Sequence, residues 1–388
     1  MKKYEVLWID DQADDQEAFS EYASRFEGIN LTSFKTAKLG IEELHLNIEY
    51  YDAVILDAKG YDESEDEKTS FSGLNKAIKK INSLSHIKKI PYFIFSAYLD
   101  KKEHASIRDL LSDEQIFLKT LDNESLFKAL KTAADQQEVT QLKHKYHNIF
   151  AICEEKYLGV KQFKRVLQVV RDIESPENIS NQQDALSPMR KILEALFKKL
   201  TNLGLIPDEI QNGMGKINGA SIFLAGKNDN YTYHQELINP VIAEKIRHLL
   251  GLTQDAAHDE GNKLGVDTYL SKTSNTYLYQ SLCFSMLELL DYMKPFIDNN
   301  SDKALNQLKW EMVQSKSFSS NEWIPGIISR IAANNYGTFQ PEDGGNTLTI
   351  IPENILKYAL LENQNIQVTT KQSPCGTKTY IDEIKLVE

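Results

Sequence analysis

The residues Tyr4-Glu5-Val6-Leu7-Trp8-Ile9-Asp10-Asp11 join a mostly apolar run to two adjacent acids. Six residues is the usual length of a β-strand, and an apolar run of this length fits a strand that is buried on both faces. Four further short runs follow in the first third of the chain, at residues 29–34, 53–56, 92–95 and 116–118. Since these runs show little polar alternation, they predict the strands of a parallel sheet covered on both faces.

The segments between these runs are rich in helix formers, with apolar residues three and four positions apart at 16–26, 74–84 and 103–111. Alternation of strands and helices is typical of α/β proteins with a parallel sheet. We therefore expect residues 1–135 to form a doubly wound five-stranded parallel sheet.

Chemically active side chains directly follow four of the five expected strands. Asp10 and Asp11 follow the first, Asp57 the third, Ser96 the fourth and Lys119 the fifth. In open α/β sheets, ligands bind outside the carboxyl ends of the strands, so these side chains should converge there. Clustered carboxylates repel one another unless a cation lies among them, and oxygen ligands suit Mg²⁺. A lysine and a hydroxyl can hold a phosphoryl group, which a carboxylate can accept as an acyl phosphate.

The fragments Leu-Trp-Ile-Asp10-Asp11, Val-Ile-Leu-Asp57, Phe-Ile-Phe-Ser96-Ala97 and Phe-Leu-Lys119 resemble the receiver (CheY-like) domain of two-component response regulators. The resemblance covers residues 1–135 and implies a flavodoxin-like fold. It implies that Asp57 takes a phosphoryl group from a cognate histidine kinase or phosphotransfer protein. Mg²⁺ would then be held by Asp10, Asp11, Asp57 and the backbone carbonyl of Lys59. Ser96 would be the switch hydroxyl, and Lys119 would pair with the phosphate.

The sequence departs from the family pattern in two places. The connection from Asp57 to Gly73 is longer than usual, lacks the expected proline, and carries five acids in the six residues 62–67. Around the lysine, Ile116 and Thr120 stand where the family often has an aromatic residue and a proline. We expect the acidic loop to be solvated, and a receiver-shaped scaffold that takes no phosphate stays open as an alternative.

The pattern in the middle of the chain predicts an all-α domain over residues 136–310. Residues 123–157 contain no proline or glycine, so the last receiver helix either continues as a connecting helix or breaks near Asp135. Further helical stretches follow at 160–173, 183–203, 240–250 and 276–297.

The fragments 189–196, 247–251 and 256–259 resemble a HEPN-type helical domain, a group that includes ribonucleases with an arginine and a histidine on one helix. Here ten residues separate Arg247 from His258, and His248 directly follows the arginine. This spacing does not match the nuclease pattern. We therefore expect a non-catalytic module for dimerisation or partner binding, and no enzyme activity beyond autodephosphorylation.

Residues 322–388 change to β character, with short runs at 326–331, 337–340, 347–351, 365–370 and 377–385. Five short strands indicate a small barrel, and their order resembles a cold-shock-type OB-fold, in which aromatic side chains stack single-stranded bases. Tyr336, Phe339 and Arg330 are the candidate nucleic-acid contacts. A protein-binding or purely structural barrel is the alternative, since this segment carries a net charge of −3.

Composition sets the remaining limits. A chain of 388 residues is too long for one core, so several domains are expected. Of the net charge of −12, the first 135 residues carry −8, which argues against broad phosphate neutralisation. No apolar run is long enough to span a membrane, and three scattered cysteines indicate a reducing compartment, so we expect a cytoplasmic location.

Together these observations predict a response regulator of a two-component phosphorelay. Phosphorylation of Asp57 would control a helical and OB-like output module, most simply in a homo-oligomer. An RNA-binding or RNA-processing effector gated by the receiver is a second hypothesis.

Overall fold

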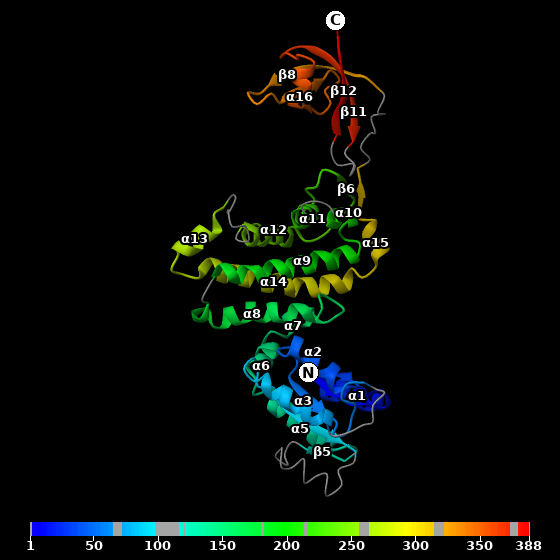
Figure 1. The fold of residues 1–388 in the computed structure, drawn as a ribbon, viewed down its shortest axis with the longest axis vertical. Coiled ribbons are helices and arrows are strands. Elements are labelled where there is room, and N and C mark those ends of the chain that lie inside the picture. The colour runs from blue at the N-terminus through cyan, green and yellow to red at the C-terminus, as the bar shows by residue number, and fades with distance from the viewer. Residues whose placement is uncertain are drawn as a thin grey trace. The chain divides into compact units, whose positions relative to one another are not determined.

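The computed structural model describes residues 2–64, 72–97, 116–119, 121–179, 182–212, 216–255, 264–313, 322–372 and 379–387. The chain forms two compact units, Met1–Glu311 and Met312–Glu388 (Figure 1). The larger unit contains the N-terminal sheet and the helical region, and the smaller unit contains the C-terminal strands.

A five-stranded parallel sheet forms the start of the larger unit, with the strand order β2-β1-β3-β4-β5. This is the flavodoxin-like order of doubly wound folds. The strands are β1 (Tyr4–Ile9), β2 (Ile29–Phe34), β3 (Ala53–Leu56), β4 (Tyr92–Ser96) and β5 (Ile116–Leu118). All five predicted strands are therefore confirmed, with bounds that agree within one residue.

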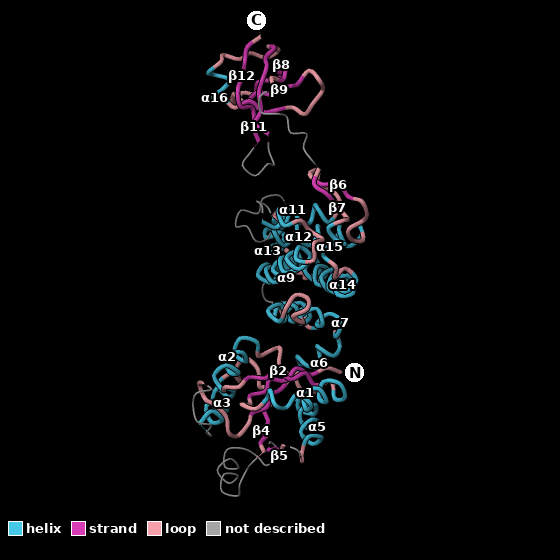
Figure 2. Tube along the Cα trace, turned by 90° about the vertical axis from the view of Figure 1, so that its right-hand side faces the viewer, coloured by secondary structure: helices cyan, strands magenta, loops and turns pink. Residues whose placement is uncertain are grey.

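Helices cover both faces of this sheet (Figure 2). Leu7 and Leu56 pack with Leu44 of α2 on one face, and Trp8 and Phe127 of α5 pack on the other. Because both faces are covered, β1, β3 and β4 are almost wholly buried, whereas the edge strand β2 exposes Thr32 and Ser33. The helices are α1 (Glu17–Tyr22), α2 (Ala37–Asn47), α3 (Ser72–Ser83) and α5 (Asn123–Ala134). The helix predicted at 103–111 lies outside the described residues.

The chain leaves the sheet through a break at Asp135. Helix α5 ends at Ala134, and α6 (Glu138–Lys145) begins after a short turn. The predicted break near Asp135 is therefore confirmed, and the alternative of one continuous connecting helix is wrong. The Asp135 carboxylate accepts hydrogen bonds from Lys2 Nζ and Tyr4 Oη, both at 3.0 Å. These contacts with the start of the chain hold the turn without any glycine or proline.

The middle region is helical, as predicted, but it is not all-α, because it also contains a small two-stranded sheet of β6 (Tyr231–Tyr233) and β7 (Trp310–Met312). Its core includes Met286 and Leu290 of α14, both fully buried. Within the described residues, no helix has both the length and the apolar character needed to cross a membrane. The helices after α6 are α7 (His147–Phe150), α8 (Phe163–Glu174), α9 (Gln182–Asn202), α10 (Asp208–Asn212), α11 (Lys216–Leu224), α12 (Pro240–Asp255), α13 (Val266–Lys272), α14 (Tyr277–Asn299) and α15 (Lys303–Gln307).

The smaller unit is an antiparallel sheet of order β10-β9-β8-β11-β12 that curls into a nearly closed barrel, since β10 also approaches β12. At Gly326 a Cβ atom would lie 2.4 Å from the backbone oxygen of Gln340, so only glycine fits this close approach of β8 to β9. The elements are β8 (Ile324–Ile331), β9 (Gly337–Pro341), β10 (Leu348–Ile350), α16 (Pro352–Lys357), β11 (Asn365–Gln372) and β12 (Thr379–Leu386).

Candidate functional site

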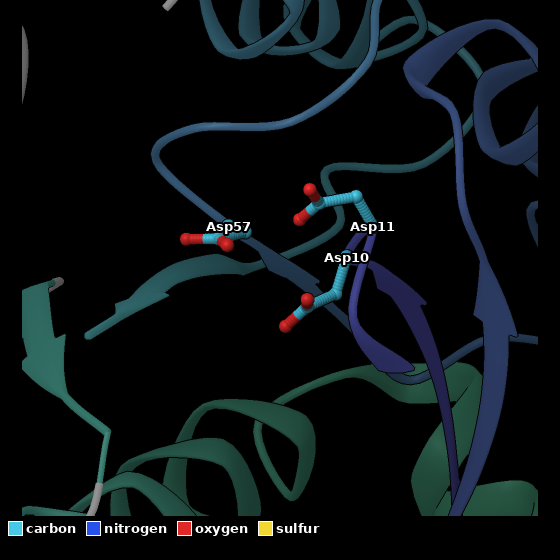
Figure 3. Close-up of side chains that lie close together, drawn as sticks. All are labelled: Asp10, Asp11 and Asp57. Atoms are coloured by element: carbon cyan, nitrogen blue, oxygen red, sulfur yellow. The ribbon is translucent and has the colours of Figure 1, made fainter. Parts of the chain in front are cut away.

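Three carboxylates meet at the carboxyl end of the parallel sheet. Asp10 and Asp11 directly follow β1, and Asp57 directly follows the neighbouring strand β3, whose Leu56 pairs with Ile9. One oxygen from each carboxylate lies within 4.8 Å of the other two. In Figure 3 the three side chains extend from these adjacent chain segments toward the same side. The convergence predicted from strand order is therefore present for these three residues.

Lys119 joins the cluster from the end of β5. Its ammonium lies 2.6 Å from Asp10 Oδ2 and 3.1 Å from Asp57 Oδ2. The backbone N–H of Lys119 donates to the carbonyl of Ser96 at 2.9 Å, which anchors the lysine to the end of β4. Burial tends to lower the pKa of Lys119, but the two carboxylates outweigh it and raise that pKa above its usual value. The lysine is therefore charged at neutral pH.

One ammonium does not balance three carboxylates. Burial and the charge of Asp57 raise the pKa of both Asp10 and Asp11 above the ordinary range. Asp10 is 1% exposed, so its charge is poorly solvated. The site thus has an excess of negative charge that a cation would relieve.

The donor set fits Mg²⁺. Asp57 Oδ1 is buried and has no hydrogen-bond partner in the described part of the chain, although a buried carboxylate oxygen normally has one. Carboxylate oxygens on a partly open rim suit an ion that keeps several waters. Asp10, Asp11 and Asp57 are therefore the residues that would hold the ion. A contribution from the backbone carbonyl of Lys59 stays a prediction.

Ser96 lies at the same rim, as the last residue of β4. It is 3% exposed and pairs in register with Leu118, one residue before Lys119. Its role as a switch hydroxyl stays a prediction.

The candidate nuclease residues of the helical region do not form a site among the described residues. Arg247 pairs with Glu244 at 3.1 Å on the surface of α12, and His248 is exposed. His258 lies outside the described residues.

The three candidate nucleic-acid residues of the barrel separate by burial. Phe339 is 0% exposed and belongs to the barrel core, so its ring offers no face to a base. It must therefore be removed from the candidate stacking residues. Tyr336 is 47% exposed, and Arg330 of β8 is exposed as well. These two flank the same β8–β9 hairpin.

Sequence reasoning missed a buried polar cluster at the opposite end of β3. Asp52 is fully buried and accepts hydrogen bonds from Thr140 Oγ1 at 2.7 Å and Lys143 Nζ at 2.6 Å. The partners are 88 and 91 residues away in the chain, so no local pattern could pair them. The sole local signal is an acid directly before an apolar strand, and such acids are commonly solvated.

No protein-family model matches the chain, and no curated protein matches it. Among solved structures, a response regulator receiver domain protein from Clostridium thermocellum is 14% identical, over 34% of this chain and 95% of that chain, with a TM-score of 0.26. A signal receiver domain from Vibrio parahaemolyticus is 12% identical, over 36% and 95%, with a TM-score of 0.26. The RcsB response regulator of Salmonella typhimurium is 16% identical, over 57% and 98%, with a TM-score of 0.27. Because these sequence identities and TM-scores are low, the function must be inferred from the geometry of the site.

Proposed function

We propose that this chain is a response regulator whose Asp57 accepts a phosphoryl group with the help of Mg²⁺. The observation that carries the proposal is the cluster of three carboxylates and one lysine at the carboxyl end of a flavodoxin-like sheet. A purely structural cluster would leave neither an excess of buried negative charge nor an unpartnered carboxylate oxygen.

The two oxygens of Asp57 have different surroundings that suit different tasks. Oδ2 is held by Lys119, whereas Oδ1 has no hydrogen-bond partner among the described residues and is free to act as the nucleophile. Oδ1 would attack the phosphorus of a phosphohistidine on the partner. The new O–P bond forms as the P–N bond breaks, and the imidazole nitrogen that leaves takes up a proton. When bound, Mg²⁺ supplies neutralisation of charge on the transferring phosphoryl oxygens.

The aspartyl phosphate would then act as a switch. A phosphoryl group brings up to two negative charges and three acceptor oxygens into the site. Lys119 can pair with these oxygens, and the buried hydroxyl of Ser96 can donate to them. The change would reach the helical region and the C-terminal barrel, which we propose as the output of the chain, in a homo-oligomer.

The experiment is intact-mass analysis of the full chain after incubation with acetyl phosphate and Mg²⁺, followed by size-exclusion chromatography. We expect one phosphoryl adduct in the wild type, none in Asp57→Asn, and none without Mg²⁺. Asp14→Asn is the matched control, because Asp14 is an exposed acid that pairs with Lys35 at 2.9 Å. Absence of the adduct, with no change in elution, would instead support the scaffold that takes no phosphate.

The exposed hairpin of the barrel favours a second candidate function, single-stranded nucleic-acid binding through Tyr336 and Arg330. Base stacking on one exposed tyrosine contributes about 1–3 kcal/mol. Fluorescence anisotropy with a labelled single-stranded RNA tests this. Binding that weakens with salt and with Tyr336→Ala supports it, and absence of binding refutes it.

A further inference from the structure

The helical region binds the sheet at the end of β3 that lies opposite Asp57. Asp52, the residue directly before β3, is 0% exposed. Its carboxylate accepts three hydrogen bonds, from the backbone N–H of Glu5 at 2.8 Å, Thr140 Oγ1 at 2.7 Å and Lys143 Nζ at 2.6 Å. Two of these donors belong to α6, so one buried acid joins the receiver to the first helix of the helical region.

The contacts around Lys143 extend this attachment. Lys143 is 8% exposed, donates to the carbonyl of Tyr50 at 3.0 Å, and lies over the rings of Tyr50 and Phe163 at 5.5 and 5.8 Å. Nearby, Arg171 of α8 bridges Glu49 at 2.8 Å and Glu138 at 2.7 Å. The segment before β3 is therefore held by α6 and α8 from outside the sheet.

Strand β3 connects this attachment directly to the phosphoacceptor. It has four residues, each at most 1% exposed, and Asp57 follows it at once. Backbone hydrogen bonds fix both ends to β1, from Asp52 N to Glu5 O at 2.7 Å and from Asp57 N to Ile9 O at 2.8 Å. At about 3.3 Å per residue, the two aspartates are about 17 Å apart along a straight segment with no loop between them. A shift of one end along the strand must therefore move the other.

We infer that Asp52 and Lys143 are positioning residues for Asp57. A buried carboxylate that loses its donors is strongly destabilising, so the Asp52–Lys143 pair acts together with the backbone hydrogen bonds to β1 to fix where β3 lies along its own axis. The position of β3 in turn sets the distances from Asp57 to Asp10 and to Lys119. The inference rests on the proposed function, because it assigns to the α6 contact control over the same phosphoacceptor site. Coupling between two sites is reciprocal, so occupation of the Asp57 site must also change the α6 contact.

The test uses the full chain and measures Mg²⁺ affinity by isothermal titration and the rate of adduct formation with acetyl phosphate. We expect Lys143→Met to lower both by at least about fivefold, the lower end of typical coupling. Lys143→Arg, which keeps the charge, should recover part of the loss. The matched control is Lys145→Met, since Lys145 is also on α6 but pairs with Glu174 on the surface at 2.6 Å. Hydrogen exchange in α6 of the wild type should change when Mg²⁺ is added.

Thr140→Val is the second variant if Lys143→Met does not fold, because it removes one hydrogen bond to Asp52 with little change in shape. A folded Lys143→Met or Thr140→Val chain with wild-type Mg²⁺ affinity and phosphorylation rate overturns the inference. Failure of the proposed function gives a different result, because the wild type itself then binds no Mg²⁺ and forms no adduct. That result removes the inference too.

Discussion

Removing one carboxylate from the site should stabilise the metal-free protein. In Asp11→Asn the two remaining acids, Asp10 and Asp57, face Lys119 with one negative charge in excess instead of two. Two unit charges 4.8 Å apart repel by about 3 kcal/mol at an effective dielectric of 20, and by about 1 kcal/mol in water. Because Asp11 is partly exposed, solvent screens much of this repulsion. We expect Asp11→Asn to raise the free energy of unfolding of the N-terminal sheet region by about 1–2 kcal/mol in chelator.

The assay is native-state hydrogen exchange of the β1 and β3 amides, which reports on the N-terminal sheet without assuming that the whole chain unfolds in one step. The measurement is made in chelator and then in excess Mg²⁺. Since an ion that binds the folded state stabilises it by RT ln(1 + [L]/Kd), Mg²⁺ should stabilise the wild type more than the variant. The difference in the free energy of unfolding between Asp11→Asn and the wild type should therefore become smaller in Mg²⁺ or change sign.

Asp14→Asn serves as the control for loss of an acid near the same rim, and it should follow the wild type. If Asp11→Asn is less stable than the wild type in chelator, the carboxylates do not repel one another as the geometry indicates. If Mg²⁺ stabilises both proteins equally, Asp11 is not a ligand.

Three buried residues, Lys88, Phe339 and Asp10, each give a further prediction. Burial lowers the pKa of Lys88 in the folded chain to about 8. Above pH 8 the unfolded chain therefore binds more protons than the folded chain, and the free energy of unfolding should rise by about 2 kcal/mol between pH 8 and 10. Urea denaturation should show this rise in the wild type and not in Lys88→Met. Phe339→Ala should lower the free energy of unfolding of the barrel by about 3–5 kcal/mol, whereas Tyr336→Ala should change it by less than about 0.5 kcal/mol. Hydrogen exchange of the barrel strands measures both effects. Equal effects of the two substitutions would contradict the difference in burial between the two rings. Burial and the charge of Asp57 raise the pKa of Asp10, so protons compete with Mg²⁺ for its carboxylate at a higher pH than for an ordinary carboxyl. Isothermal titration at pH 7.5 and 5.5 should show weaker Mg²⁺ binding at 5.5, and equal affinity would contradict this.

The N-terminal fold was predictable because its central strands are buried on both faces. The residues of β3, Ala53 to Leu56, are all apolar and all buried, so burial and sequence agree at every position. The acidic cluster was predictable for a related reason. Parallel strands end at one edge, so residues that follow the strands must converge even when, like Asp10 and Asp57, they lie far apart in sequence.

The remaining features depend on contacts between distant parts of the chain. The break at Asp135 has no helix breaker and is held by Lys2 and Tyr4 from the start of the chain. Phe339 was expected at a binding surface because aromatic residues serve both as core and as stacking platform. Only the curvature of the barrel decides that this ring points inward, while Tyr336 stays exposed.

The charge of the site also predicts how the proposed phosphorylation should depend on Mg²⁺. In an aspartyl phosphate, up to two negative charges on the phosphoryl group would replace the single charge of Asp57, beside the carboxylates of Asp10 and Asp11. At these distances each added like-charge pair costs about 1–3 kcal/mol, depending on how far solvent screens it. A divalent cation cancels most of this repulsion. The equilibrium between the chain and a phosphodonor should therefore lie further toward phosphorylated Asp57 in Mg²⁺ than in chelator, independently of any effect of the ion on rate.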